Sequence, residues 1–306
     1  MDINLLIGMI LALIGYTVIN LGLVLEKKGL DSQSKILETS FSSNVRNFLN
    51  NKTWLFGLLG TVVGTLVSYV ALIFAPITVI QVFLGVGLSF LALFSFFLLN
   101  EKLSRFELLG IVIVIIGVAL LSIIAEAFKT AENDLENLKS LINSKESILF
   151  VVILSVVQII LWFTGKKKRN AITGISFGLI SGVSAGLAQL YMKGIMGGLK
   201  DYLKTPSELT FLIWLLLMVV FLTISFITLQ MGFQYAAATH VAPLFNISAL
   251  IIPVVGGGVI YKEWSTLSTN ETIIAITSLL IVSFGVFLLS VMSNLKETKE
   301  TSEEKR

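Results

Sequence analysis

The stretch TWLFGLLGTVVGTLVSYVALIFAPITVIQVFLGVGLSFLALFSFFLLN, residues 53–100, contains no Asp, Glu, Lys or Arg. A helix that crosses the hydrocarbon core of a bilayer needs about 20 apolar residues, so this stretch is long enough for two crossings. Pro76 stands near its middle, and proline interrupts a helix because it has no backbone N–H. The stretch therefore predicts a membrane hairpin with spans at 54–74 and 76–99.

Charge-free segments of this kind continue along the chain. Only 13% of the 306 residues are charged and 55% are hydrophobic, whereas soluble domains carry about 25% charged residues. This composition excludes a soluble globular protein, and the absence of cysteine excludes disulfides and Cys-ligated zinc. We predict nine spans, with the remaining seven at 3–25, 108–125, 148–164 and 172–192, two within 209–261 that separate near 236–238, and one at 272–293.

Polar segments divide the chain. We assign 1–125 to a first four-helix unit, 126–147 to a hydrophilic loop, 148–171 to a linker helix, 172–293 to a second four-helix unit and 294–306 to a charged tail expected to be disordered. Apolar residues at helical spacing predict amphipathic surface helices in 31–53 and in 126–147. The apolar positions are Leu37, Phe41, Val45 and Phe48 in the first segment, and Phe128, Ala131, Leu135, Leu138 and Ile142 in the second.

Basic residues are unequally divided between the two ends of the spans. Fifteen of the 22 Lys and Arg residues lie on the side of the C-terminus, and seven lie on the side of the N-terminus. Because basic residues mark the cytoplasmic side, we expect a multi-pass protein of the cell membrane with its N-terminus outside and its C-terminus in the cytoplasm.

The two four-helix units echo each other in sequence at offsets between 161 and 168 residues. The matches pair LEKKG (25–29) with LYMKG (190–194), APITVI (75–80) with AAATHV (236–241), LNEK (99–102) with YKEW (261–264), and GVALLS (117–122) with GVFLLS (285–290). The linker helix adds one crossing, so the second unit enters the membrane from the opposite side. We therefore predict an all-α polytopic membrane protein with an inverted 4+1+4 repeat, a plan typical of secondary transporters that bind substrate near the midplane.

These residues also resemble a known family. A four-helix unit whose first helix ends in Lys-Gly and whose third ends in Asn-Glu-Lys resembles a small multidrug resistance protein. Two such units in one chain resemble the EamA-like drug/metabolite transporter (DMT) superfamily. Within it the chain is most similar to the NIPA branch, a family assigned to magnesium transport, through LEKKGL (25–30), FAPIT (74–78), LNEKL (99–103) and YKEW (261–264). The resemblance covers nearly the whole chain and implies Mg²⁺ as the substrate.

Two positions depart from the family patterns. Small multidrug resistance proteins carry a membrane-embedded glutamate in their first helix, where this chain reads Val18-Ile19-Asn20-Leu21. This difference argues against proton-coupled drug export through such a carboxylate. A Thr-Pro pair expected of NIPA proteins reads Gln81-Val82 in the third span and Ala242-Pro243 in the eighth.

Four amide side chains are the candidate substrate contacts. An amide within hydrocarbon must find hydrogen-bond partners in the protein or line a polar path. By the resemblance, the first and third helices of each unit line a central cavity, and each of these helices carries one amide: Asn20, Gln81, Gln189 and Asn246. Interhelical hydrogen bonding is the alternative role.

Charged groups near the span ends are candidates for gating or for collecting a cation: Lys28, Glu101, Lys193, His240 and Glu263. We expect Lys193 just beyond a span that ends at Met192. The alternative roles of these residues are to mark topology and to fix helix ends. Pro243, Pro253 and the glycines 256–258 predict a kinked or broken eighth span, whose freed carbonyls would bind a cation.

The sequence favours a transporter over an enzyme. It has no phosphate-binding Gly-Lys-Ser/Thr loop, no acidic metal cluster and only one histidine, so we expect no cofactor and leave a metal site unassigned. The leading hypothesis is alternating-access transport of a small solute or cation between the units. A channel-like magnesium permease, and a membrane scaffold or sensor that transports nothing, stay open as alternatives. We expect membrane lipid and substrate as partners and no nucleic acid, and a homodimer is left open.

Overall fold

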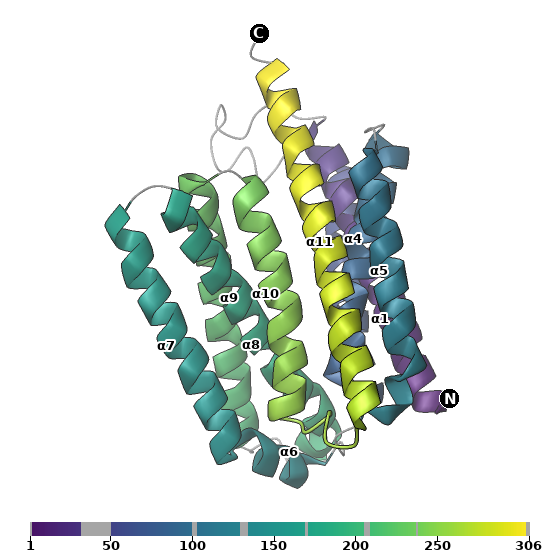
Figure 1. The fold of residues 1–306 in the computed structure, drawn as a ribbon, viewed down its shortest axis with the longest axis vertical. Coiled ribbons are helices and arrows are strands. Elements are labelled where there is room, and N and C mark those ends of the chain that lie inside the picture. Colours follow the sequence, from purple (N-terminus) through teal and green to yellow (C-terminus); the bar gives the residue numbers. More distant parts are fainter. Residues whose placement is uncertain are drawn as a thin grey trace.

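The computed structural model describes residues 2–31, 50–99, 103–128, 134–168, 171–204, 209–236 and 238–303. The helices of these ranges are α1 (Ile3–Asp31), α3 (Lys52–Phe74), α4 (Ile77–Leu99), α5 (Arg105–Ile123), the 3₁₀ turn η2 (Ala125–Ala127), α6 (Leu135–Ile142), α7 (Lys145–Lys168), α8 (Ala171–Lys204), α9 (Leu209–Tyr235), α10 (Ala238–Val259) and α11 (Thr269–Glu303) (Figure 1). Within the described ranges, nine helices are long and apolar enough to cross a membrane. The prediction of an all-helical polytopic membrane protein is therefore confirmed.

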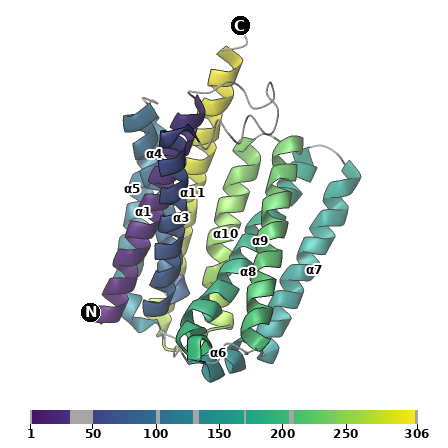
Figure 2. The ribbon, with the colours of Figure 1, turned by 180° about the vertical axis from the view of Figure 1, so that it is seen from behind.

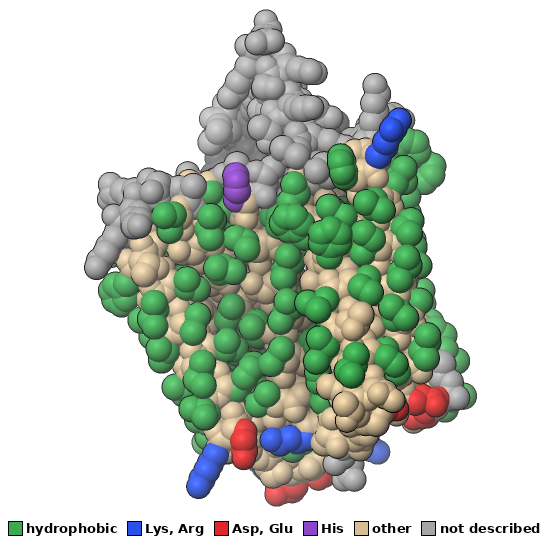
Figure 3. Space-filling view, viewed as in Figure 1, with side chains coloured by type: hydrophobic (Ala, Val, Ile, Leu, Met, Phe, Trp, Pro, Cys, Tyr) green, Lys and Arg blue, Asp and Glu red, His purple; other side chains and the backbone are tan. Residues whose placement is uncertain are grey.

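The long helices stand side by side in one bundle, with the two termini at opposite ends (Figures 1 and 2). We call the end that holds the N-terminus and α6 the N face, and the end that holds the C-terminus the C face. The charged side chains visible in Figure 3 lie at these two ends, and a band of hydrophobic side chains separates them. Such a band is what a polytopic protein must present to the hydrocarbon core of a bilayer.

The helix contacts follow the two units. In the first unit α1 packs against α3 and α4, and in the second unit α8 packs correspondingly against α9 and α10. The two units meet where α4 contacts α10 and where α5 contacts α11, while α7 packs on α8 at the edge of the bundle. The third and fourth helices of each unit thus form most of the junction, and α3 also contacts α8.

Glycines on the first helix of each unit allow a neighbouring helix of the same unit to approach closely. A Cβ atom at Gly15 of α1 would lie 2.7 Å from the backbone N of Ser68 on α3, and a Cβ at Gly182 of α8 would lie 2.5 Å from the carbonyl O of Phe245 on α10. Real Cβ atoms do not approach so closely, so only glycine fits at these two crossings. Small residues at helix crossings are the usual means of close packing in membranes.

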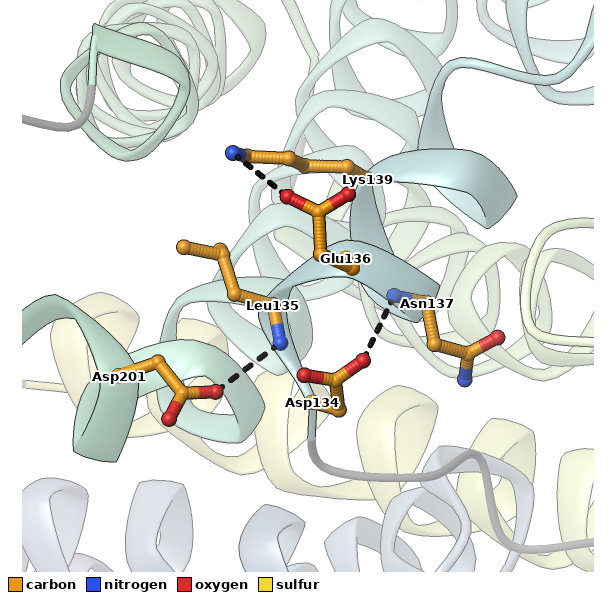
Figure 4. A network of polar contacts seen from close by, with 6 residues as sticks. All are labelled: Asp134, Leu135, Glu136, Asn137, Lys139 and Asp201. Carbon is orange, nitrogen blue, oxygen red and sulfur yellow. Dashed lines mark hydrogen bonds and ion pairs between the residues drawn. The ribbon is translucent and has the colours of Figure 1, made fainter.

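Helix α8 is longer than the sequence indicated. We predicted its end at Met192, with Lys193 just beyond, whereas α8 continues to Lys204 and contains Lys193. Its last turns are covered by α6, which explains why they stay helical. Figure 4 shows Asp201 of α8 accepting a hydrogen bond from the backbone N of Leu135 at 3.2 Å, while Asp134 caps α6 through the backbone N of Asn137 at 3.1 Å.

The segments outside the membrane spans agree only in part with the helices expected from the sequence. The predicted amphipathic helix of 126–147 is present as the shorter α6, which buries Leu135 and Leu138. The segment 32–49, where a second surface helix was expected, lies outside the described residues. Helix α11 continues to Glu303, into the segment expected to be a disordered tail. Lys and Glu alternate there at helical spacing, which favours a helix.

Candidate functional site

The turn between α3 and α4 is where charged groups from the second unit meet the first. In an α-helix the N–H of residue i bonds the carbonyl of residue i−4, so Pro76, which has no N–H, leaves the carbonyl of Leu72 without its helical partner. The ammonium of Lys193 donates to this carbonyl O of Leu72, and also to the carbonyl O of Ala75 at 2.9 Å. Lys193 of α8 therefore supplies the hydrogen bond that Pro76 cannot make.

A carboxylate occupies the other side of the same turn. The first N–H groups of a helix need acceptors, which a Ser, Thr, Asp or Asn side chain usually provides from the residue before the helix, and Pro76 has no such side chain. Glu263 takes this role, because its Oε1 accepts from the backbone N of Ile77 at 2.6 Å and its Oε2 accepts from the backbone N of Thr78 at 2.9 Å. The second unit thus caps both helix ends of the first unit's α3–α4 turn.

The end of α10 positions Glu263. The backbone N of Ile260 donates to the carbonyl O of Gly256, and that of Glu263 donates to the carbonyl O of Gly257, a pattern that closes a helix with a left-handed residue. Lys262 is that residue, with φ 55°. A Cβ on Gly257 would lie 2.6 Å from Oε2 of Glu263, so only glycine leaves room for the carboxylate.

Two aromatic residues complete this arrangement. The hydroxyl of Tyr261 donates to the carbonyl O of Leu190 on α8 at 2.5 Å, and Nε1 of Trp264 donates to Oγ1 of Thr78 at 3.1 Å. We call Lys193, Tyr261, Glu263, Trp264 and Thr78 the N-face cluster. Its contacts join α8 and the end of α10 to the α3–α4 turn, so they fasten the two units together at the N face.

The N-face cluster buries two opposite charges. Lys193 and Glu263 are both 0% exposed. Burial raises the pKa of the Glu263 carboxyl, while the Lys193 ammonium and the N–H donors of Thr78 and Ile77 act in the opposite direction. Breaking one member of such a pair is costly, since the other charge is left buried without compensation.

A second proline creates a similar situation deeper in the bundle. Pro253 lies inside α10 and leaves the carbonyl of Ala249, four residues earlier, without its helical donor. Nε2 of Gln81 on α4 donates to this carbonyl O at 3.1 Å. The side chain of Gln81 is 0% exposed, and its Oε1 has no hydrogen-bond partner in the structure. A buried acceptor of this kind at the contact between the two units is a candidate contact for a bound cation or its water.

The other predicted amides lie within single units. Nδ2 of Asn20 donates to the carbonyl O of Tyr16 at 2.7 Å, and its side chain packs against Gly87 of α4. Nδ2 of Asn246 donates to Oγ of Ser290 on α11 at 2.9 Å, and Gln189 is half-buried on α8. Asn246 lies one helical turn before Ala249, whose carbonyl accepts from Gln81. Asn20 lies instead at the contact between α1 and α4.

The charged candidates of the C face are arranged differently from those of the N face. Lys28, which the sequence repeat relates to Lys193, is exposed at the end of α1, and His240 is exposed at the start of α10. Glu101, the counterpart of Glu263, lies outside the described residues. Helix α3 contacts α8 at the N face, but in the described part of the chain α1 and α9 make no contact of comparable extent.

Sequence reasoning missed part of this site. Of the expected kinked or broken eighth span, the break is excluded, since α10 is continuous from Ala238 to Val259 with both prolines inside it. Helix α10 stays continuous because it is closely packed and because a side chain of the other unit bonds its free carbonyl. The sequence pattern does not display these contacts. The roles of Thr78, Tyr261 and Trp264 were not foreseen, although APIT and YKEW had been singled out as motifs. The proline positions were the available signal, because each one identifies a carbonyl that needs a donor.

Metal-binding side chains do not gather in the described ranges, where no group of three or more His, Cys, Asp or Glu residues is placed to hold a metal ion. The fold defines the class of the molecule as a polytopic, all-helical membrane protein, with nine candidate spans in the described ranges. The family model described as "Magnesium transporter NIPA" matches residues 3–295. The chain belongs to this family.

Named relatives match the chain over nearly its whole length. The chain is 24% identical over 304 residues to "Probable magnesium transporter NIPA6" of Arabidopsis thaliana, covering 98% of this chain and 92% of that protein. It is 23% identical over 294 residues to "Magnesium transporter NIPA4" of Mus musculus, covering 94% of this chain and 72% of that protein. No solved structure matches the chain.

Proposed function

We propose that this protein transports Mg²⁺ across the cell membrane by alternating access between its two inverted units. The observation that carries the proposal is Gln81, a fully buried amide on α4 whose oxygen has no partner and whose nitrogen donates to α10 of the other unit. The family match over residues 3–295 supports Mg²⁺ as the transported ion.

The amides suit a hydrated ion. Mg²⁺ loses its water reluctantly, and its bound waters donate hydrogen bonds to oxygen acceptors. Asn20, Gln81 and Asn246 each donate through nitrogen to a fixed protein acceptor, which leaves the amide oxygen as an acceptor. Together with Gln189 on α8, these residues are the proposed contacts along the path.

The gate is proposed from the difference between the two faces. At the N face, Lys193 and Glu263 hold the α3–α4 turn to the second unit, which we interpret as the closed side. The sequence repeat places Lys28 and Glu101 in the equivalent positions relative to the α9–α10 turn. In the alternate state we expect Lys28 to reach that turn and Glu101 to cap α10, while the N-face cluster separates. We assign the N face to the outside, following the distribution of Lys and Arg.

Purified protein in liposomes tests the proposal. We expect Mg²⁺ uptake to saturate with concentration, and Gln81→Leu to abolish it. Gln158→Leu is the matched control, because Gln158 is also a buried amide but lies on α7, away from the contact between α4 and α10, where it accepts from Ser184 at 2.5 Å. Absence of Mg²⁺ movement by folded wild-type protein would contradict the proposal, as would equal loss in both variants.

A further inference from the structure

A cavity of 230 Å³ lies between α7, α8 and α9, away from the contact between α4 and α10. Ile148 and Val152 of α7 form one wall and Ile213 of α9 forms the other. The floor is made of buried side chains of α8 and of the segment after α10, namely Leu187, Leu190, Tyr191, Ile260 and Tyr261. In the described part of the chain, α7 and α9 make no extensive contact of their own, so α8 is the base of the space between them.

Most of the lining is aliphatic or aromatic, and two of its hydroxyls already have partners. The hydroxyl of Tyr261 donates to the carbonyl O of Leu190, and the hydroxyl of Ser147 donates to the carbonyl O of Leu141 at 2.7 Å. A polar solute that entered would recover few of the hydrogen bonds that it gives up to water. The lining therefore selects an apolar occupant, and it does not suit Mg²⁺.

The cavity opens toward lipid. Ile148, Val152 and Ile213 belong to membrane spans and are 53%, 49% and 45% exposed, so they form the rim of the opening on the bilayer side of the bundle. One end of the cavity reaches Asn143, an exposed residue at the end of α6 next to Lys145, where α7 begins. An apolar chain with a polar head group at the membrane surface matches this apolar lining and its polar end.

We propose that the space between α7 and α9 is a binding site for one acyl chain of a membrane phospholipid, with the phosphate head group near Asn143 and Lys145. The site goes beyond the proposed transport activity, because its lining is separate from the amides. The site adjoins the N-face cluster. Its floor residues Leu190 and Tyr261 hydrogen-bond to each other, and they lie close to Lys193 and Glu263.

A phosphatidylcholine that carries a diazirine on its acyl chain tests the site when it is photolysed with the full-length protein in liposomes. Exposed residues such as Ile153 face lipid in any case and report general labelling. Leu187, Tyr191 and Trp214 line the cavity and are buried, so they are labelled only if a chain enters it. We expect adducts at these buried positions, mapped by peptide mass spectrometry.

A filling variant and a matched control make the result decisive. Val151→Phe adds volume at a lining position and should remove the buried adducts, whereas Ile153→Phe, on the same helix but outside the lining, should keep them. Ile213→Phe repeats the test from the opposite wall if Val151→Phe does not fold. Added phospholipid should also raise the Tm of wild type and Ile153→Phe in detergent more than that of the filled variant. Labelling of Ile153 without labelling of the floor overturns the proposal, as does buried labelling that survives both filling variants. Because the readout is lipid labelling, a failure here is distinct from a failure of Mg²⁺ transport.

Discussion

Lys193 donates to the carbonyl O of Leu72, the acceptor that Pro76 leaves without a helical N–H. Gln81 donates to the carbonyl O of Ala249, which Pro253 leaves in the same condition. In the first case the donor comes from the second unit, and in the second case it comes from the first. Each unit therefore supplies the hydrogen-bond donor for a backbone carbonyl that a proline leaves unpaired in the other unit. These two contacts make the junction between the units specific.

Lys193→Met should destabilise the protein strongly. The change leaves two buried carbonyls without a donor and the Glu263 carboxylate without its opposite charge, at a cost of roughly 3–5 kcal/mol. The loss should appear as a lower Tm in detergent. Lys200→Met is the control, since Lys200 is an exposed lysine on the same helix. The double variant Lys193→Met/Glu263→Gln should lose less than the sum of the single losses, and strict additivity would show that the two charges do not interact.

Gln81→Leu should cost about 1–3 kcal/mol of stability, because the carbonyl of Ala249 becomes a buried acceptor without a donor. In a Pro253→Ala background residue 253 regains its N–H, so this carbonyl receives its helical bond and the cost of Gln81→Leu should shrink. A double-mutant cycle on Tm measures the difference. Transport should remain lost in the double variant if the Gln81 oxygen contacts the ion, which separates the proposed function of the amide from its structural role.

Gly257→Ala should weaken the N-face cluster. The added methyl would lie 2.6 Å from Oε2 of Glu263 and 2.8 Å from Oγ1 of Thr78, so the carboxylate must move from its place at the start of α4. Overpacking of this kind costs roughly 1–3 kcal/mol. At Gly60 of α3 the nearest atom would be 3.4 Å away, so Gly60→Ala is the control and should not lower the Tm. An unchanged Tm for Gly257→Ala would mean that Glu263 does not depend on this space.

Lys28→Met should affect transport without affecting the stability of the state described here. Lys28 is exposed in this state, so its removal leaves the Tm near that of wild type. If Lys28 closes the C face in the alternate state, the same change slows Mg²⁺ uptake. Lys52→Met removes another exposed lysine of the C face and should leave uptake unchanged. Equal Mg²⁺ uptake by the two variants would show that Lys28 does not take part in closing the C face.

The sequence was most informative where a single physical constraint dominates. Charge-free segments of bilayer length predicted the nine spans, because hydrocarbon excludes charge almost regardless of the neighbouring helices. The sequence misplaces Lys193 for the same reason, because a lysine at the edge of an apolar segment predicts a helix end there. Its burial depends on acceptors 118 and 121 residues away along the chain. Pro76 and Pro253 identify the carbonyls that need donors, but only the packing of the two units decides which side chains supply them.

Countertransport tests the central claim most directly. Liposomes loaded with Mg²⁺ and placed in isotopically labelled Mg²⁺ should accumulate label faster than empty ones, since a carrier exchanges ions through one site that faces each side in turn. We predict saturable accumulation of this kind, and its loss in Gln81→Leu but not in Gln158→Leu. A current that rises in proportion to voltage, with no acceleration by internal Mg²⁺, would contradict alternating access and identify a pore.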